Sequence, residues 1–271
     1  MAQPKRIVST FPSATETLFA LNAGDRVVGV STYCRYPPAV LSLPKVGSYV
    51  KPDPEKIALL RPDLVVIPDT AAGIADRLSA LHIRYVRIKV GSLAEIYSMI
   101  RDIGVAVSVP GAAESLNHRI RSRLEAIRAT NADRPKPTVL IVVGRTPGLL
   151  TNLIVAGPSS YLSELLQIAG GANVLAGEAM EYPHISLETV VRLNPDVILD
   201  MSLMGESTEP RIHEERLRQA WLSRRELSAV KNSMVFGLVS ETLVTPGPRV
   251  ADAIEEIRGR IQAAIPRRAA Q

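Results

Sequence analysis

The sequence predicts an α/β protein of two related α/β lobes joined by one long rigid helix, with a ligand cleft between the lobes. Apolar strand segments alternate with helical segments in both halves, which is typical of α/β folds. Two blocks of sequence recur in the same order in the two halves, and one long helical pattern separates them. A length of 271 residues suits two domains. We place the N-terminal lobe at residues 5–108, the connecting helix at 109–132 and the C-terminal lobe at 137–271.

The first half opens with a strand at residues 6–10 and a helix that begins at Pro12 and Ser13. Glu16 stands three residues after Ser13, which is the spacing of a capping box. We expect this helix to end at Ala23-Gly24, because glycine tolerates the left-handed conformation found after helices. The alternation then continues through strand 27–30, helix 55–60, strand 64–67, helix 75–81, strand 85–88 and helix 93–107.

A long helix is predicted at residues 111–129, midway between the two α/β patterns. Its apolar positions, Leu116, Ile120, Leu124 and Ile127, recur at helical spacing. At 1.5 Å per residue this helix spans roughly 28 Å, the width of a small domain. We therefore interpret it as a strut between the lobes rather than an ordinary covering helix, and we expect little bending on ligand binding.

The second half restarts the alternation after Pro137. Its predicted strands lie at 139–143, 197–199 and 235–238, and its helices at 159–169, 187–193 and 249–265.

The internal repeat has two parts. The block EKIALLRPDLVVI at 55–67 matches ETVVRLNPDVIL at 188–199, with a constant offset of 133 residues from Glu55 to Glu188. The segment from Pro12-Ser13 to Ala23-Gly24 matches the segment from Pro158-Ser159 to Ala169-Gly170, with an offset of 146 residues. Two such blocks in the same order indicate related lobes. Ligands of open α/β sheets bind beyond the carboxyl ends of the strands, and two facing lobes form a cleft there.

Composition excludes several classes of function. The net charge is +5, but the basic residues are scattered and aromatics make up only 4%, which argues against nucleic-acid binding. The lone Cys34 forms no internal disulfide, no Cys/His cluster has zinc-site spacing, and no apolar run approaches a transmembrane helix. No signal peptide is visible at the N-terminus. Two alternatives therefore stay open: the protein is cytoplasmic, or the given sequence lacks its leader.

Enzyme motifs are absent from the sequence. It contains no G-x-G-x-x-G, Walker A or G-x-S-x-G pattern, and Asp63 and Asp196 each follow a proline before an apolar strand, which is turn chemistry. The four histidines are too scattered for a site that binds a naked metal ion. We expect a binding protein and not an enzyme. An enzyme that uses a bound metal chelate is the alternative, and a turnover assay would distinguish the two.

Several motifs together resemble one family. They are RIVSTFPSATETLFALNAG, VVGVSTYCRYPP, EKIALLRPDLVVIP, GGANVLA, HISLETVVRLNPDVIL and VKNSMVFGL followed by TPGPRVADAIEEI. In this order they resemble the ABC-importer binding proteins for cobalamin, haem and ferric siderophores, and STYCRYPP is most similar to the cobalamin-binding branch. The resemblance implies two lobes joined by a rigid helix and a periplasmic or cell-surface monomer with no intrinsic cofactor. It also implies two partners, a metal chelate and a permease dimer at the membrane.

The resemblance also assigns roles to single residues. It implies that Tyr33 and Tyr49 of the first lobe and Tyr182 and Glu241 of the second border a cobalamin-like ligand. Tyr49 and Tyr182 stand where the cobalamin binder typically has tryptophans, and Thr245 stands where it has an arginine. Ser13 belongs to the candidate ligand site because helix-start N–H groups bind anions, with plain capping as the alternative.

Two further hypotheses concern metal binding and docking. Tyr182 and His184 share a predicted loop, and both residue types ligate haem iron, so His184 is the one candidate metal ligand and haem is the alternative to cobalamin. Glu55 and Glu188 are equivalent in the repeat and begin helices, where the dipole stabilises a carboxylate. The resemblance implies that they dock to arginines of the two permease subunits. Ordinary capping is the alternative role.

Overall fold

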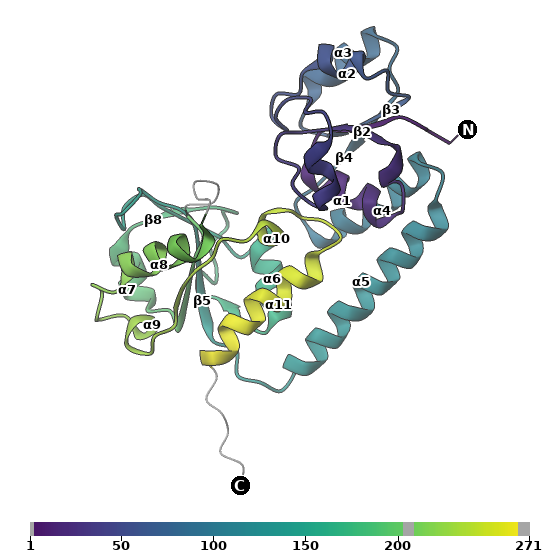
Figure 1. The fold of residues 1–271 in the computed structure, drawn as a ribbon. Helices are drawn as coiled ribbons and strands as arrows, with labels where there is room; N and C mark the ends of the chain where they lie inside the picture. Colours follow the sequence, from purple (N-terminus) through teal and green to yellow (C-terminus); the bar gives the residue numbers. More distant parts are fainter. Residues whose placement is uncertain (1–2, 203–208, 265–271) are drawn as a thin grey trace. The chain divides into compact units, whose positions relative to one another are not determined.

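The computed structural model describes residues 3–202 and 209–264. The described chain divides into two compact units. One comprises the residues up to Ser122 together with Thr245–Val250, and the other comprises Arg123–Val244 together with the residues from Ala251 on. Each unit has its own sheet (Figure 1).

The first unit contains a four-stranded parallel sheet in the order β2-β1-β3-β4. Every residue of β3 is buried, because helices cover both faces of the sheet: α2 and α3 lie on one side of the strands and α1 and α4 on the other (Figure 1). The strands are β1 (Ile7–Ser9), β2 (Val27–Val30), β3 (Leu64–Pro68) and β4 (Tyr85–Ile88), and the helices are α1 (Pro12–Ala20), α2 (Pro54–Leu59), α3 (Ala72–Ala80) and α4 (Leu93–Ala106).

The long helix α5 runs over Pro110–Asn131, and the boundary between the units falls within it, after Ser122. Its length is 22 residues, or about 33 Å. The four apolar positions predicted from the sequence, Leu116, Ile120, Leu124 and Ile127, are all buried. The helix itself is therefore confirmed. Its rigidity and the domain boundaries drawn from the sequence stay predictions.

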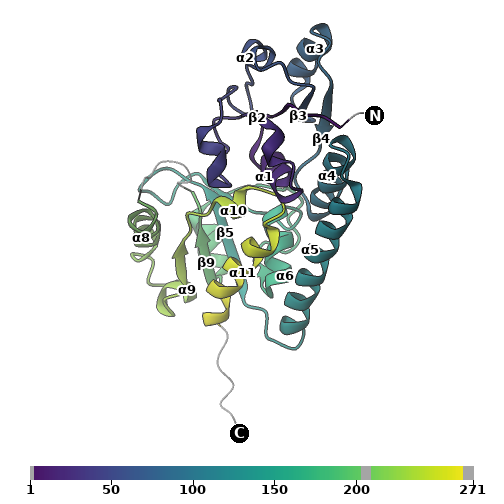
Figure 2. The same ribbon diagram turned by 45° about the vertical axis from the view of Figure 1, so that its right-hand side comes forward.

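The second unit contains a mixed sheet in the order β10-β9-β5-β6-β8, with β7 pairing β5. Figures 1 and 2 show α11 beside α6, and the strands lie between these helices and α8. The strands are β5 (Thr138–Gly144), β6 (Leu153–Val155), β7 (Ala172–Asn173), β8 (His184–Ile185), β9 (Val197–Asp200) and β10 (Val235–Gly237), and the helices are α6 (Tyr161–Ala169), α7 (Leu187–Leu193), α8 (Pro210–Trp221), α9 (Ser228–Lys231), α10 (Glu241–Val244) and α11 (Val250–Ile261).

The repeated Pro-Asp has the same structural task in both units. Asp63 accepts hydrogen bonds from the backbone N–H groups of Lys5 at 2.7 Å and Arg6 at 3.0 Å, just before β1. Asp196 accepts from the backbone N–H of Thr138 at 2.8 Å and from its hydroxyl at 2.7 Å, at the start of β5. Each aspartate thus ties the start of one parallel strand to the start of its neighbour. The interpretation of these carboxylates as structural is confirmed.

Two details predicted for the first repeated helix are wrong. The N-cap of α1 is Phe11, which makes no side-chain capping bond, and Ser13 lies inside the helix. The helix ends at Ala20 rather than at Ala23-Gly24, and Asn22, with φ 56°, takes the left-handed conformation expected of Gly24. In the second copy Ser160, not Ser159, caps α6, whereas Gly170 ends it with φ 94° as predicted. A short polar side chain near a helix start does not by itself fix which residue becomes the cap.

Candidate functional site

The longest loop at the carboxyl edge of the first sheet carries an exposed aromatic pair. Strand β2 ends at Val30, and Tyr33 and Tyr49 both belong to the loop that leads from it to α2. Their ring centroids lie 6.3 Å apart with the ring planes at 74°, an edge-to-face arrangement. The two residues are 57% and 46% exposed. Two amphipathic rings therefore stand open to solvent at the edge where parallel sheets bind ligands.

Backbone hydrogen bonds hold this loop. The N–H of Ser31 donates to the carbonyl of Ser9 at 3.1 Å, and the N–H of Thr32 donates to the carbonyl of Gly47 at 2.9 Å. In the same loop the thiol of Cys34 is buried and lies 3.2 Å from the hydroxyl of Thr15. The tyrosines are thus presented on an anchored backbone, which reduces the entropy that a ligand would have to remove.

Another tyrosine of the same loop, Tyr36, contacts an ion pair. The Arg249 guanidinium lies 4.0 Å from the ring centre of Tyr36 and pairs with both carboxylate oxygens of Glu16. Glu16 is only 4% exposed. The sequence predicts that Glu16 is half of a capping box with Ser13. Its partner lies 233 positions away, which no local pattern reveals.

Ser13 and Thr245 lie deeper than the tyrosines. Ser13 is 3% exposed and Thr245 is 9% exposed. The segment containing Thr245 passes over the start of α1, because a Cβ built on Gly247 would lie 3.3 Å from the Cβ of Ser13. Ser13 and Thr245 are thus buried, whereas Tyr33 and Tyr49 are exposed.

The second unit places Tyr182 on the segment that enters β8. The Gly157 N–H donates to the carbonyl of Glu181 at 2.8 Å, and a side chain on Gly157 would overlap the carbonyl of Met180. This close approach fixes the backbone next to Tyr182, whose ring is 37% exposed. Partial burial, with a smaller contribution from the charge of Glu181, raises the pKa of the Tyr182 phenol above its ordinary value. The phenol is therefore neutral and can donate a hydrogen bond.

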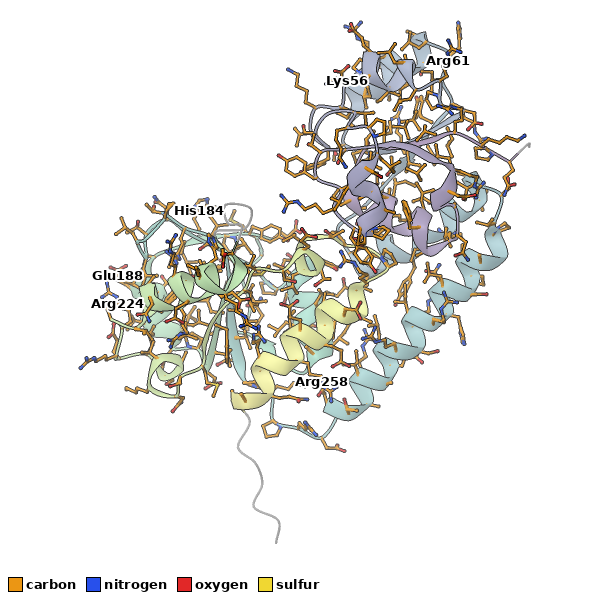
Figure 3. All side chains as sticks on the ribbon, viewed as in Figure 1. Lys56, Arg61, His184, Glu188, Arg224 and Arg258 are labelled. Atoms are coloured by element: carbon orange, nitrogen blue, oxygen red, sulfur yellow. The ribbon has the colours of Figure 1, made fainter. Side chains whose placement is uncertain are left out.

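His184 lies at the carboxyl edge of the second sheet. It pairs with Ile154, and Ile154 pairs with Gly144, the last residue of β5. Its side chain is exposed (Figure 3). Glu241 is also exposed and begins α10. Among residues 3–202 and 209–264 no group of three or more His, Cys, Asp or Glu side chains is arranged to hold a metal ion.

Glu55 and Glu188 occupy the same position in their helices. Each is the second residue of its helix, α2 or α7, and each is exposed. The capping role goes to other residues, because the side chains of Asp53 and Ser186 accept the N-terminal N–H bonds. The N-caps are thus Asp53 and Ser186, while both glutamates lie in the first turn at the positive end of the helix dipole, and this helix-start role stays the alternative to docking.

The surroundings of the two glutamates differ. The hydroxyl of Ser186, the backbone N–H of Glu188 and the charge of Arg224 hold the pKa of the Glu188 carboxyl below its ordinary value. Figure 3 shows Glu188 and Arg224 on the same side of the second unit, and Lys56 and Arg61 around α2 in the first. Glu188 thus lies near a basic side chain of its own unit, Arg224.

Comparison with known proteins identifies the family. The periplasmic binding protein family matches residues 7–242. The chain belongs to this family. A vitamin B12-binding protein of Vibrio cholerae serotype O1 is 30% identical over 93% of this chain and 87% of its own length. The uncharacterized ABC transporter substrate-binding lipoprotein YvrC of Bacillus subtilis is 29% identical over 94% of this chain and 79% of its own length.

Solved structures of periplasmic binding proteins share the fold. The vitamin B12 binding protein BtuF of Vibrio cholerae has a TM-score of 0.78 and 28% identity, covering 96% of this chain and 98% of its own. A periplasmic haem binding protein from Pseudomonas aeruginosa also has a TM-score of 0.78, with 25% identity and coverages of 94% and 92%. These relatives are binding proteins rather than enzymes, as the sequence predicts. In the described part of this periplasmic binding protein, no helix is both long and apolar enough to cross a membrane.

Proposed function

We propose that this protein is the substrate-binding component of an ABC importer and that its ligand is a corrinoid of the cobalamin type. The observation that carries the proposal is the exposed edge-to-face pair of Tyr33 and Tyr49 at the carboxyl edge of the first sheet. The relationship to vitamin B12-binding proteins supports the choice of ligand. Membership of the periplasmic binding protein family supports a role outside the cytoplasmic membrane.

A corrinoid suits this pair chemically. It is a large, rigid macrocycle with an apolar face and amide groups at its rim. Tyrosine rings contribute apolar contact area, and their hydroxyls bond to polar groups at the rim. In this proposal Tyr182 and Glu241 supply the contacts from the second unit. The neutral Tyr182 phenol donates a hydrogen bond, and the Glu241 carboxylate accepts bonds from amide N–H groups.

The experiment that tests the ligand is an absorbance titration of the purified protein with hydroxocobalamin, haemin and a ferric catecholate. The proposal predicts saturable binding of hydroxocobalamin, tighter than that of the other two chelates. A Tyr33→Ala, Tyr49→Ala double variant should weaken this binding. Tyr97→Ala, which removes a tyrosine from α4, is the matched control and should not. Saturable binding of haemin or the ferric catecholate in preference to hydroxocobalamin would reject the corrinoid.

Haem is the second candidate ligand. The observation that favours it is the exposed imidazole of His184 at the carboxyl edge of the second sheet, since imidazole is a common axial ligand of haem iron. If haem is the ligand, haemin binding should shift the Soret band and His184→Ala should abolish the shift. His82→Ala, which removes a histidine from the end of α3 in the other unit, serves as the control.

The docking surfaces belong to the same proposal. Glu55 and Glu188 are exposed at equivalent positions of α2 and α7. A permease of two related subunits offers two equivalent sites, and arginine–carboxylate pairs are the strong charge-assisted contacts that such docking needs. We therefore assign one glutamate to each permease subunit.

A further inference from the structure

The second unit contains a pocket whose lining includes none of Tyr182, His184, Glu188 and Glu241. The pocket has a volume of about 860 Å³ and is lined by the turn that follows β5 and by one face of α8. Ligand sites typically measure roughly 300–1,000 Å³. Because Arg145 directly follows β5 and Asp200 ends the neighbouring strand β9, the pocket lies at the carboxyl edge of this sheet.

The floor of the pocket is fixed by a buried ion pair. The side chain of Arg145 is 1% exposed, and its Nε donates to Asp200 Oδ2 at 2.8 Å. The same carboxylate oxygen accepts from Trp221 Nε1 at 2.7 Å, and Arg145 also donates to the carbonyl of Leu149 at 2.9 Å. Asp200 therefore compensates the charge of Arg145, and the bonds hold the turn after β5 against α8. The floor is rigid and close to neutral.

The wall formed by α8 carries the positive charge. Arg211 and Arg216 both line the pocket, and neither has a hydrogen-bond or ion-pair partner in residues 3–202 or 209–264. The third arginine of this helix, Arg218, is absent from the lining and donates two hydrogen bonds to Glu215. Of the three arginines of α8, the two that line the pocket are thus the ones without a partner among the described residues.

The one carboxylate in the lining does not neutralise these two arginines. Glu215 accepts hydrogen bonds from Arg218 and Gln219, which lower its pKa to about 2. It is ionised at neutral pH, but Arg218 compensates its charge. Apolar atoms of Pro147 and Ile212 complete the lining. The pocket therefore combines an uncompensated charge of two guanidinium groups with an apolar wall.

We propose that this pocket binds the carboxylate or phosphate group of a small organic molecule, with Arg211 and Arg216 as the groups that hold the oxyanion. Guanidinium groups form paired, charge-assisted hydrogen bonds with both kinds of oxyanion. The oxyanion has two possible sources, a peripheral group of the transported chelate or a separate small anion. The first source rests on the proposed function, and the second does not.

The test compares an Arg211→Gln, Arg216→Gln double variant with the wild-type protein and with an Arg225→Gln, Lys231→Gln control. The control loses the same charge from exposed positions of the same unit outside the pocket. Each protein is titrated at low salt with haemin and with hydroxocobalamin. In parallel, thermal unfolding is followed with increasing succinate or inorganic phosphate. These free anions probe the pocket without any chelate.

The outcomes separate the two sources. If the oxyanion belongs to the chelate, the pocket variant should bind one of the two chelates at least about tenfold more weakly, and the control should bind like wild type. If it belongs to a free anion, chelate binding is unchanged, and the stabilisation by succinate or phosphate is lost in the pocket variant alone. Equal chelate affinities and equal anion stabilisation in all three proteins would overturn the proposal. Should wild type bind neither chelate, the proposed function fails while the anion series still decides the pocket.

Discussion

The guanidinium of Arg249 lies 4.0 Å from the ring centre of Tyr36 while it pairs with the buried carboxylate of Glu16. The contact joins the segment Thr245–Val250 to α1 and to the loop that carries the exposed tyrosines, all within the first unit. A buried carboxylate that loses its partner destabilises a protein strongly. This ion pair is therefore a structural support of the tyrosine surface.

Replacement of Arg249 tests this support. Arg249→Met removes the guanidinium that pairs with the buried Glu16 and should lower the free energy of unfolding by roughly 3 kcal/mol, whereas an Arg249→Met, Glu16→Met double variant should lose less because the buried carboxylate is removed as well. Urea unfolding followed by far-UV circular dichroism measures both. Arg101→Met, an exposed arginine of α4, is the control. A double variant less stable than either single variant would contradict the account.

Asp200 offers a test confined to the second unit. Its carboxylate serves both Arg145 and Trp221, so Asp200→Leu leaves a buried guanidinium unpaired and should destabilise the protein by about 3–5 kcal/mol. Trp221 is the sole tryptophan of the chain and is fully buried, so its fluorescence reports directly on this region. The urea midpoint should fall and the native emission should change. Asp196→Leu, which removes only exposed hydrogen bonds at a strand start, should cost less.

The ligand contacts of the two units are tested separately. Tyr49→Ala and Tyr182→Ala should each weaken corrinoid binding by roughly 1–3 kcal/mol if both rings are anchors. Phenylalanine at the same positions separates ring contact from hydrogen bonding, because Tyr182→Phe removes only the hydroxyl. Isothermal titration calorimetry measures the changes. Wild-type affinity in both alanine variants would remove these residues from the site.

Docking is tested with a Glu55→Ala, Glu188→Ala double variant. It should keep its ligand affinity and nearly its full melting temperature, because Asp53 and Ser186 still cap the helices. Complex formation with the permease in detergent should weaken, and Glu→Lys at both sites should weaken it further because like charges then oppose the permease arginines. An Asp53→Ala, Ser186→Ala variant is the converse control, with lower stability but intact docking. Wild-type amounts of complex at both low and high salt would end the docking hypothesis.

Much of the fold could be predicted because its signals are local. Continuous apolar runs predicted strands at 64–67 and 197–199, which the structure has at Leu64–Pro68 and Val197–Asp200. Helical periodicity predicted a helix at 111–129, which the structure has at Pro110–Asn131. The helix Pro210–Trp221 and the strands Leu153–Val155 and His184–Ile185 were missed. Strands of two or three residues carry no period, and they form because a neighbouring strand offers them an edge: β5 pairs with Leu153–Val155, which in turn pairs with His184–Ile185.

The sequence by itself determined the two related α/β halves, the helix between them and the residue types of a binding protein, because these depend on periodicity and on motifs that lie within a few turns of chain. Only the tertiary structure decided which of the candidate residues are exposed. It buried Ser13 and Thr245, paired Glu16 with Arg249, and placed Arg211 and Arg216 in the lining of a pocket with no partner among the described residues. Burial and charge compensation depend on residues far apart in the chain, and no local pattern encodes them.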